Sequence, residues 1–298
     1  MRLVTFTHNG ADKIGALNAE SKTITDLKAA DPSLPSTMQA LIERGHDGLS
    51  QAQAAIDSAG EKARLSADDV VLKAPIPEPR RDVMAVGRNY HEHAQEFHDS
   101  GFDATSGATA VPDDPIIFTK ATTSVSGPFD PIPAYLDPTN STDYEGELAV
   151  IIGTGGRGIS KADAFDHVYG YTTSNDVTAR TLQHQHKQWF IGKGLDGYCP
   201  MGPVLLTADE AGHPDTFHLK TEVNGEIRQD SSCSALIFDI PTLIETISTG
   251  ITLLPGDIIV TGTPVGVGIG FKPPVFLKKG DVVRVDISPI GAIENVVE

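Results

Sequence analysis

Short apolar runs separated by turn residues dominate the hydrophobic pattern of this chain. Such runs, when rich in β-branched residues, are typical of buried strands. The pattern predicts strands at residues 1–6, 83–87, 116–120, 148–152, 168–176 and 258–260, and a final strand at 282–287. It also predicts a hairpin at 219–228, because Asn224-Gly225 is a favoured two-residue turn between strands.

Helical spacing of apolar residues is found in fewer places. A helix is predicted over 36–59, with Ser36 as its N-cap after Pro35. Shorter helices are predicted at 162–167, 177–187 and 243–248, and a further helix follows the turn after the strand at 83–87.

The chain divides into two predicted domains, residues 1–73 and 80–298. The first is a small unit in which we find no group of residues that suggests chemistry. Between the two lies a proline-rich connector, which cannot continue as a helix. Residues 98–115 form a long polar and glycine-rich loop of the kind that often covers a site as a lid.

Two acidic side chains are expected to converge where an apolar strand begins. Glu145 and Glu147 are two residues apart, so in a strand they point to the same face. Close carboxylates repel each other unless a cation compensates them, and their oxygens suit Mg²⁺, Mn²⁺ or Ca²⁺. Asp176, at the end of another strand, could supply a third ligand. Taken alone, solvated glutamates and an aspartate in a turn fit the same pattern.

A second group of polar residues follows the strand at 83–87. His93 and Glu96 are three residues apart on a predicted helix, where a carboxylate can orient an imidazole as a general base. Lys193 lies between two glycines and has room to stabilise a developing oxyanion. A solvated helix face and an ordinary loop lysine are the alternative interpretations of these residues.

Composition and charge narrow the possible classes of function. No apolar run is long enough for a transmembrane helix, and the two cysteines fit a reducing cytoplasm. The net charge of −17 argues against nucleic acid as a partner. An anionic substrate would therefore need local positive charge from a metal, arginine or lysine.

Two His-x-His pairs raise the question of zinc. His91 with His93, and His184 with His186, are each two residues apart, so on a helix the members of a pair point to different faces. A zinc hydrolase built on His184 and His186 stays open as an alternative. It predicts stoichiometric zinc in the protein and an activity that is retained in Glu147→Ala.

Six motifs, in the same order, resemble those of the fumarylacetoacetate hydrolase family, from about Val83 to the end of the chain. They are residues 87–90 with His93 and Glu96, residues 143–147, residues 175–180, Lys193, Asn224-Gly225, and residues 255–257 with 261–264. The resemblance implies an α+β, mostly β fold: a distorted β-roll catalytic domain, usually a homodimer, with the small N-terminal α/β domain of bacterial members.

The resemblance also implies roles for individual residues. Glu145, Glu147 and Asp176 would hold Mg²⁺ or Mn²⁺, and His93, Glu96 and Lys193 would be catalytic. The implied substrate-binding residues are Arg88, Asn89, Tyr90, Gln183 and Thr263.

The implied activity is hydrolysis of a C–C bond in an acylpyruvate or related 1,3-diketo acid through a metal-held enolate. His93 and Glu96 would activate the attacking water. The same groups could decarboxylate an oxaloacetate-like 2-oxo acid or isomerise a 2-hydroxy-dienoate, because these reactions need the enolate but no water. A non-catalytic protein that binds 2-oxo acids is the alternative outside enzymes, although a binder needs no base.

Overall fold

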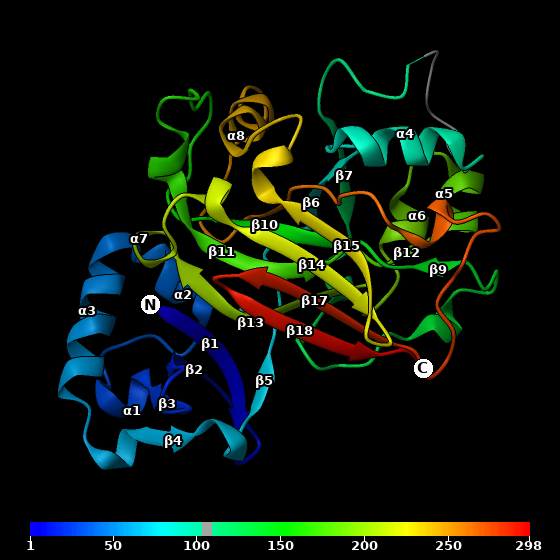
Figure 1. The fold of residues 1–298 in the computed structure, drawn as a ribbon. Helices are drawn as coiled ribbons and strands as arrows, with labels where there is room; N and C mark the ends of the chain where they lie inside the picture. The colour runs from blue at the N-terminus through cyan, green and yellow to red at the C-terminus, as the bar shows by residue number, and fades with distance from the viewer. Residues whose placement is uncertain (103–108) are drawn as a thin grey trace.

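One large open sheet runs through the molecule. The computed structural model describes residues 1–102 and 109–298, and in it strands outnumber helices in residues, which confirms the expected α+β, mostly β class (Figure 1). The sheet order is β4 (Arg64–Ser66), β3 (Thr23–Asp26), β2 (Ala11–Asn18), β1 (Arg2–His8), β13 (Cys199–Thr207), β11 (Val168–Asn175), β10 (Gly146–Ile152), β16 (Ile258–Val260), β6 (Val83–Gly87) and β7 (Ile116–Lys120). Two short strands join it from the side, β5 (Val71–Lys73) on β1 and β8 (Val125–Ser126) on β13.

The N-terminal segment shares this sheet with the rest of the chain. Strand β1 pairs antiparallel with β13, with Arg2 opposite Leu206 and Leu3 opposite Leu205. Residues from both predicted domains pack in the same hydrophobic clusters, for example Phe6 with Val204. The division at residues 1–73 and 80–298 stays a prediction; the structure adds that the two parts are joined by main-chain hydrogen bonds as well as by the connector.

The predicted helix over 36–59 is two helices, so the single-helix prediction was wrong. Helix α2 (Met38–Glu43) and helix α3 (Gly45–Ser58) are separated at Arg44, and the φ of +55° at Gly45, where α3 begins, breaks the continuous right-handed helix that was predicted. The N-cap is Thr37 and not Ser36, because the Thr37 hydroxyl accepts the Ala40 N–H at 3.3 Å. Together with α1 (Leu27–Ala30), these helices cover the N-terminal strands.

A smaller sheet lies against the large one. Its order is β15 (Glu226–Ser232), β14 (His218–Val223), β17 (Val282–Ser288) and β18 (Gly291–Val296). The predicted hairpin is confirmed, with Asn224 and Gly225 both at positive φ. The strand at 282–287 is not the final one, because a cis Ser288-Pro289 turn leads into β18. A Cβ on Gly146 would overlap the Thr221 hydroxyl, so glycine lets β10 approach β14.

Three helices lie together near one end of the large sheet, beside β6 and β7 (Figure 1). They are α4 (His91–Asp99), α5 (Arg180–His186) and α6 (Phe190–Lys193). Helix α5 begins later than the predicted 177–187, because residues 178–179 form strand β12, which pairs with β9 (Thr142–Asp143). Of the predicted lid over 98–115, residues 98–99 belong to α4, and residues 103–108 lie outside the described residues.

The other helices complete the cover of the sheet. Helix α8 (Ile240–Ser248) starts three residues before its predicted position, with Asp239 as N-cap, and α7 (Ala208–Ala211) follows β13. The predicted helix at 162–167 is a 3₁₀ turn at Ala164–His167. Among the described residues, no helix combines the length and apolar character that a membrane span requires.

Candidate active site

The structure brings Glu145, Glu147 and Asp176 together. Glu145 precedes β10 and Glu147 lies in it, while Asp176 follows the antiparallel neighbour β11, whose Asn175 is opposite Gly146. One carboxylate oxygen from each of the three lies within 4.8 Å of the others, and all three side chains are buried. The i, i+2 spacing and the strand pairing therefore produce a compact acidic cluster.

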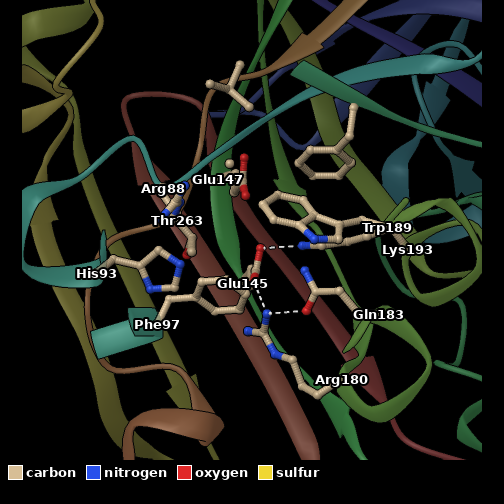
Figure 2. Close-up of a pocket in the computed structure, with 13 residues that line it drawn as sticks. Arg88, His93, Phe97, Glu145, Glu147, Arg180, Gln183, Trp189, Lys193 and Thr263 are labelled. Carbon is tan, nitrogen blue, oxygen red and sulfur yellow. Dashed lines mark hydrogen bonds and ion pairs between the residues drawn. The ribbon is translucent and has the colours of Figure 1, made fainter. Parts of the chain in front are cut away.

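Two buried cations compensate Glu145. Its Oε2 accepts Lys193 Nζ at 2.7 Å, and its Oε1 lies 2.6 Å from Arg180 Nη1 (Figure 2). Burial raises the pKa of Glu145, but Lys193 and Arg180 outweigh burial and bring this pKa to about 2. Lys193 also donates to Asp176 Oδ2 at 2.7 Å. Glu145 is thus ionised at neutral pH.

Glu147 is the carboxylate with the least compensation. Its Oε2 accepts the backbone N–H of Gly262 at 2.5 Å. Burial, with the neighbouring charges of Asp176 and Glu145, raises the pKa of Glu147 well above its usual range. A divalent cation would remove this penalty, and a donor set of three carboxylates is suited to a hard cation such as Mg²⁺ or Mn²⁺. The residues of this cluster therefore fit the expected metal.

His93 and Glu96 form the expected pair on helix α4. His93 Nδ1 lies 3.0 Å from Glu96 Oε2, and His93 is 4% exposed. The Glu96 carboxylate also accepts the backbone N–H of Gly266, at 3.1 Å. A carboxylate at Nδ1 favours the tautomer with the proton there, which leaves Nε2 as the basic nitrogen.

His93 and two residues of the acidic cluster, Glu145 and Glu147, line one pocket. Its wall also includes Arg88, Gln183, Thr263, Trp189 and Phe118. Arg88 is 7% exposed and has φ of +54°, a conformation uncommon for a residue with a Cβ. Three of the five expected substrate-binding residues, Arg88, Gln183 and Thr263, therefore lie at this pocket together with Glu145, Glu147 and His93.

Asn89 and Tyr90 are close by in sequence but are not among the residues that line the pocket. The Asn89 amide donates to the backbone carbonyls of Thr261 at 2.7 Å and Phe238 at 3.0 Å. Tyr90 is buried and hydrogen-bonds to Cys233. Substrate contact by Asn89 and Tyr90 stays a prediction.

Three buried residues of the site, Arg180, Asp143 and Lys120, had no role predicted from the sequence. Arg180 bonds to Asp143 at 2.9 Å as well as to Glu145, and Lys120 Nζ lies 2.5 Å from Asp176 Oδ1. Asp143 could have been identified by spacing, because it precedes Glu145 by two residues. Lys120 is harder to identify from the sequence than Asp143, because its only distinguishing feature there is that it ends an apolar strand.

His184 and His186 lie apart from this cluster. His184 Nδ1 contacts the backbone carbonyl of Phe102 at 3.1 Å, and both histidines are exposed. Within residues 1–102 and 109–298, the acidic cluster is the one group of three or more ligating side chains close enough to share a metal. The zinc alternative thus gains no support from the geometry.

The fold and the acidic cluster define a protein with a buried site that could hold a metal ion. A family model described as "Fumarylacetoacetate (FAA) hydrolase C-terminal" matches residues 82–298. The chain therefore belongs to the fumarylacetoacetate hydrolase family, as its motifs predicted.

Named relatives and solved structures agree with this assignment. The oxaloacetate tautomerase YisK of Bacillus subtilis is 50% identical over 230 residues, which are 77% of this chain and 74% of YisK. The mitochondrial oxaloacetate tautomerase fahd2 of Xenopus laevis is 41% identical over 299 residues, 99% of this chain and 89% of fahd2. The fumarylacetoacetate hydrolase of Exiguobacterium antarcticum matches with a TM-score of 0.83 at 41% identity, covering 100% and 99% of the chains. Maleylpyruvate hydrolase of Sphingobium, solved with manganese(II) and pyruvate, matches with a TM-score of 0.77 at 33% identity, covering 100% and 98%.

The expected reaction class was wrong. The chain was expected to hydrolyse a C–C bond, but the relatives at 50% and 41% identity are named for tautomerisation of oxaloacetate. The error has a physical origin, because the motifs encode an acidic cluster and a nearby base. Those groups serve both reactions, and residue spacing does not show whether a water attacks.

Proposed function

We propose that this protein is a metal-dependent tautomerase that interconverts the enol and keto forms of oxaloacetate or a closely related 2-oxo dicarboxylic acid. The observation that carries the proposal is the identity of 41% across 99% of the chain to a protein named oxaloacetate tautomerase, in a chain that keeps a buried acidic cluster beside a His-Glu pair. Tautomerisation replaces the hydrolysis that was expected from the sequence. It is close to the decarboxylase and isomerase alternatives, because all three reactions pass through an enolate and differ in what the enolate then becomes.

Glu145, Glu147 and Asp176 would hold Mg²⁺ or Mn²⁺. When bound, the cation supplies a Lewis acid that draws electrons from the 2-oxo group and so acidifies the neighbouring C–H bond. The choice between the two metals, a homodimer and a cytoplasmic location all stay predictions.

His93 is proposed to move the proton. In the keto-to-enol direction Nε2 takes a proton from the carbon next to the 2-oxo group, and the imidazolium then gives that proton to the 2-oxo oxygen. In the other direction the imidazolium returns a proton to carbon. Glu96, 3.0 Å from Nδ1, stabilises the positive charge on the ring while it holds that proton. The two forms are isomers, so His93 ends each cycle in its starting state.

The cationic side chains are proposed to hold the substrate. Lys193 stabilises negative charge that develops on the 2-oxo oxygen, since its ammonium already lies within the acidic cluster. Arg88, Gln183 and Thr263 line the same pocket and bind the carboxylates. In a chain of net charge −17, a dianion would need the positive charge of these side chains together with that of the bound cation.

The test is the rate at which the enol form of oxaloacetate, prepared fresh, loses its ultraviolet absorbance with protein and Mg²⁺ or Mn²⁺. We expect acceleration over the uncatalysed rate, with keto-oxaloacetate as the product. Release of CO₂ at the same rate would assign decarboxylation instead. Binding of oxalate or pyruvate with no turnover of any enol would support the non-catalytic alternative.

A further inference from the structure

Lys120 is a fully buried lysine behind the acidic cluster. It is the last residue of β7, has no exposed surface and is not among the residues that line the pocket. Its ammonium donates to three acceptors, which are Asp176 Oδ1 at 2.5 Å, the backbone carbonyl of Val177 at 3.1 Å, and the backbone carbonyl of Lys193. All three N–H groups of the ammonium are therefore used by the protein.

These contacts join three separate parts of the chain. Asp176 follows β11, Lys193 ends helix α6, and Lys120 comes from the far edge of the large sheet. Lys120 holds Asp176 by Oδ1, while Oδ2 of the same carboxylate accepts Lys193 Nζ, which also contacts Glu145. Because Lys120 also holds the Lys193 carbonyl, it fixes the base of the side chain whose Nζ contacts Glu145 and Asp176.

We propose that Lys120 is a positioning residue for the metal and for Lys193, an inference that rests on the metal site of the proposed function. It restricts Asp176 to one ligating oxygen and keeps that oxygen in place when Lys193 turns from Asp176 to the substrate. A buried ammonium is costly to desolvate, and hydrophobic replacements of buried ion pairs often stabilise proteins. Partners that orient metal ligands, in contrast, typically change metal affinity about 10–100-fold when they are removed.

The test is the affinity for Mn²⁺, measured without substrate by the electron paramagnetic resonance signal of the free ion. Lys120→Met removes the ammonium and keeps most of the side-chain volume, and Lys120→Gln is a polar second variant. We expect both to bind Mn²⁺ at least tenfold more weakly than the wild type. In Asp176→Asn, the further loss caused by Lys120→Met should be much smaller, because Lys120 acts through Asp176.

Asn295→Ala is the matched control. Asn295 is also fully buried and donates to three backbone carbonyls, those of Gly127, Pro128 and Asp130, in a different part of the fold. This variant should lose stability and keep wild-type affinity for Mn²⁺. A folded Lys120→Met or Lys120→Gln protein with wild-type Mn²⁺ affinity would overturn the inference. A wild-type protein that binds Mn²⁺ but accelerates no enol conversion would instead overturn the proposed function.

Discussion

Nδ1 of His93 lies 3.0 Å from Oε2 of Glu96, and the backbone N–H of Gly266 reaches both oxygens of that carboxylate, at 3.1 and 3.3 Å. The histidine and its partner are thus fixed by a loop that follows β16 and not only by their own helix. Glu96 has two identified roles in this arrangement, one in orienting the imidazole and one in joining α4 to the loop.

Replacing His93 should separate metal binding from turnover. We expect His93→Ala to lower kcat for enol conversion by about 10²–10⁴-fold, the usual contribution of a general acid-base group. Affinity for Mn²⁺ should stay within a factor of two, because no atom of His93 belongs to the acidic cluster. Steady-state kinetics and metal titration on one preparation check both statements. Full activity in His93→Ala would exclude it as the proton carrier.

A methyl group at Gly270 should displace Glu96. A Cβ at this position would overlap Glu96 Oε1 and come within 2.5 Å of its Cδ. Since Glu96 is a flexible side chain, we expect Gly270→Ala to cost little stability but to lower kcat by about tenfold, as the orientation of His93 is lost. Gly250→Ala is the control, because nothing lies within 4 Å of a Cβ there and its φ is not positive. Equal kcat in the two variants would contradict this role for Glu96.

Metal binding should release a proton. In the metal-free protein burial, with Asp176 and Glu145, raises the pKa of Glu147 well above its usual range, so its carboxyl keeps a proton to higher pH than an ordinary glutamic acid does. A cation binds only the carboxylate, and therefore affinity should fall as the pH is lowered. Calorimetric titration of Mn²⁺ in two buffers with different ionisation enthalpies measures the protons released. Binding without proton release, at an affinity independent of pH, would show that Glu147 is ionised before the metal arrives.

Loss of His184 and His186 should leave the activity intact. Both side chains are exposed, and His184 contacts a backbone carbonyl. The double variant His184→Ala/His186→Ala should keep kcat/KM within a factor of two, and purified wild-type protein should contain no stoichiometric zinc by elemental analysis. A zinc-containing wild type whose activity is lost in the double variant would restore the zinc alternative.

The sequence predicted the convergence of the three acidic residues better than it predicted the reaction. Glu145, Glu147 and Asp176 converge because alternation in a strand and pairing of neighbouring strands are local rules that a sequence displays. Lys120 was missed because a lysine at a strand end is usually solvated, whereas tertiary packing buries this one. Arg180 stood within a recognised motif, but its contacts with Asp143 and Glu145 depend on tertiary structure.

The errors in the fold are also local. Apolar spacing continues through Arg44 and Gly45, so the pattern did not show that the chain turns there between α2 and α3. Strand β18 follows a proline turn and was overlooked, although it pairs with β17 along its whole length. The residues did not determine the reaction, because a base beside a metal site can take a proton either from water or from carbon.

The most direct test of the account is the rate of enol-oxaloacetate conversion by protein freed of divalent cations with a chelator and then titrated with Mg²⁺ or Mn²⁺. We predict that catalysis is lost on chelation, returns in proportion to the metal bound, and does not return in Glu147→Gln. Undiminished catalysis after complete removal of metal, or full reactivation of Glu147→Gln, would contradict the claim that this acidic cluster holds a cation needed for the reaction.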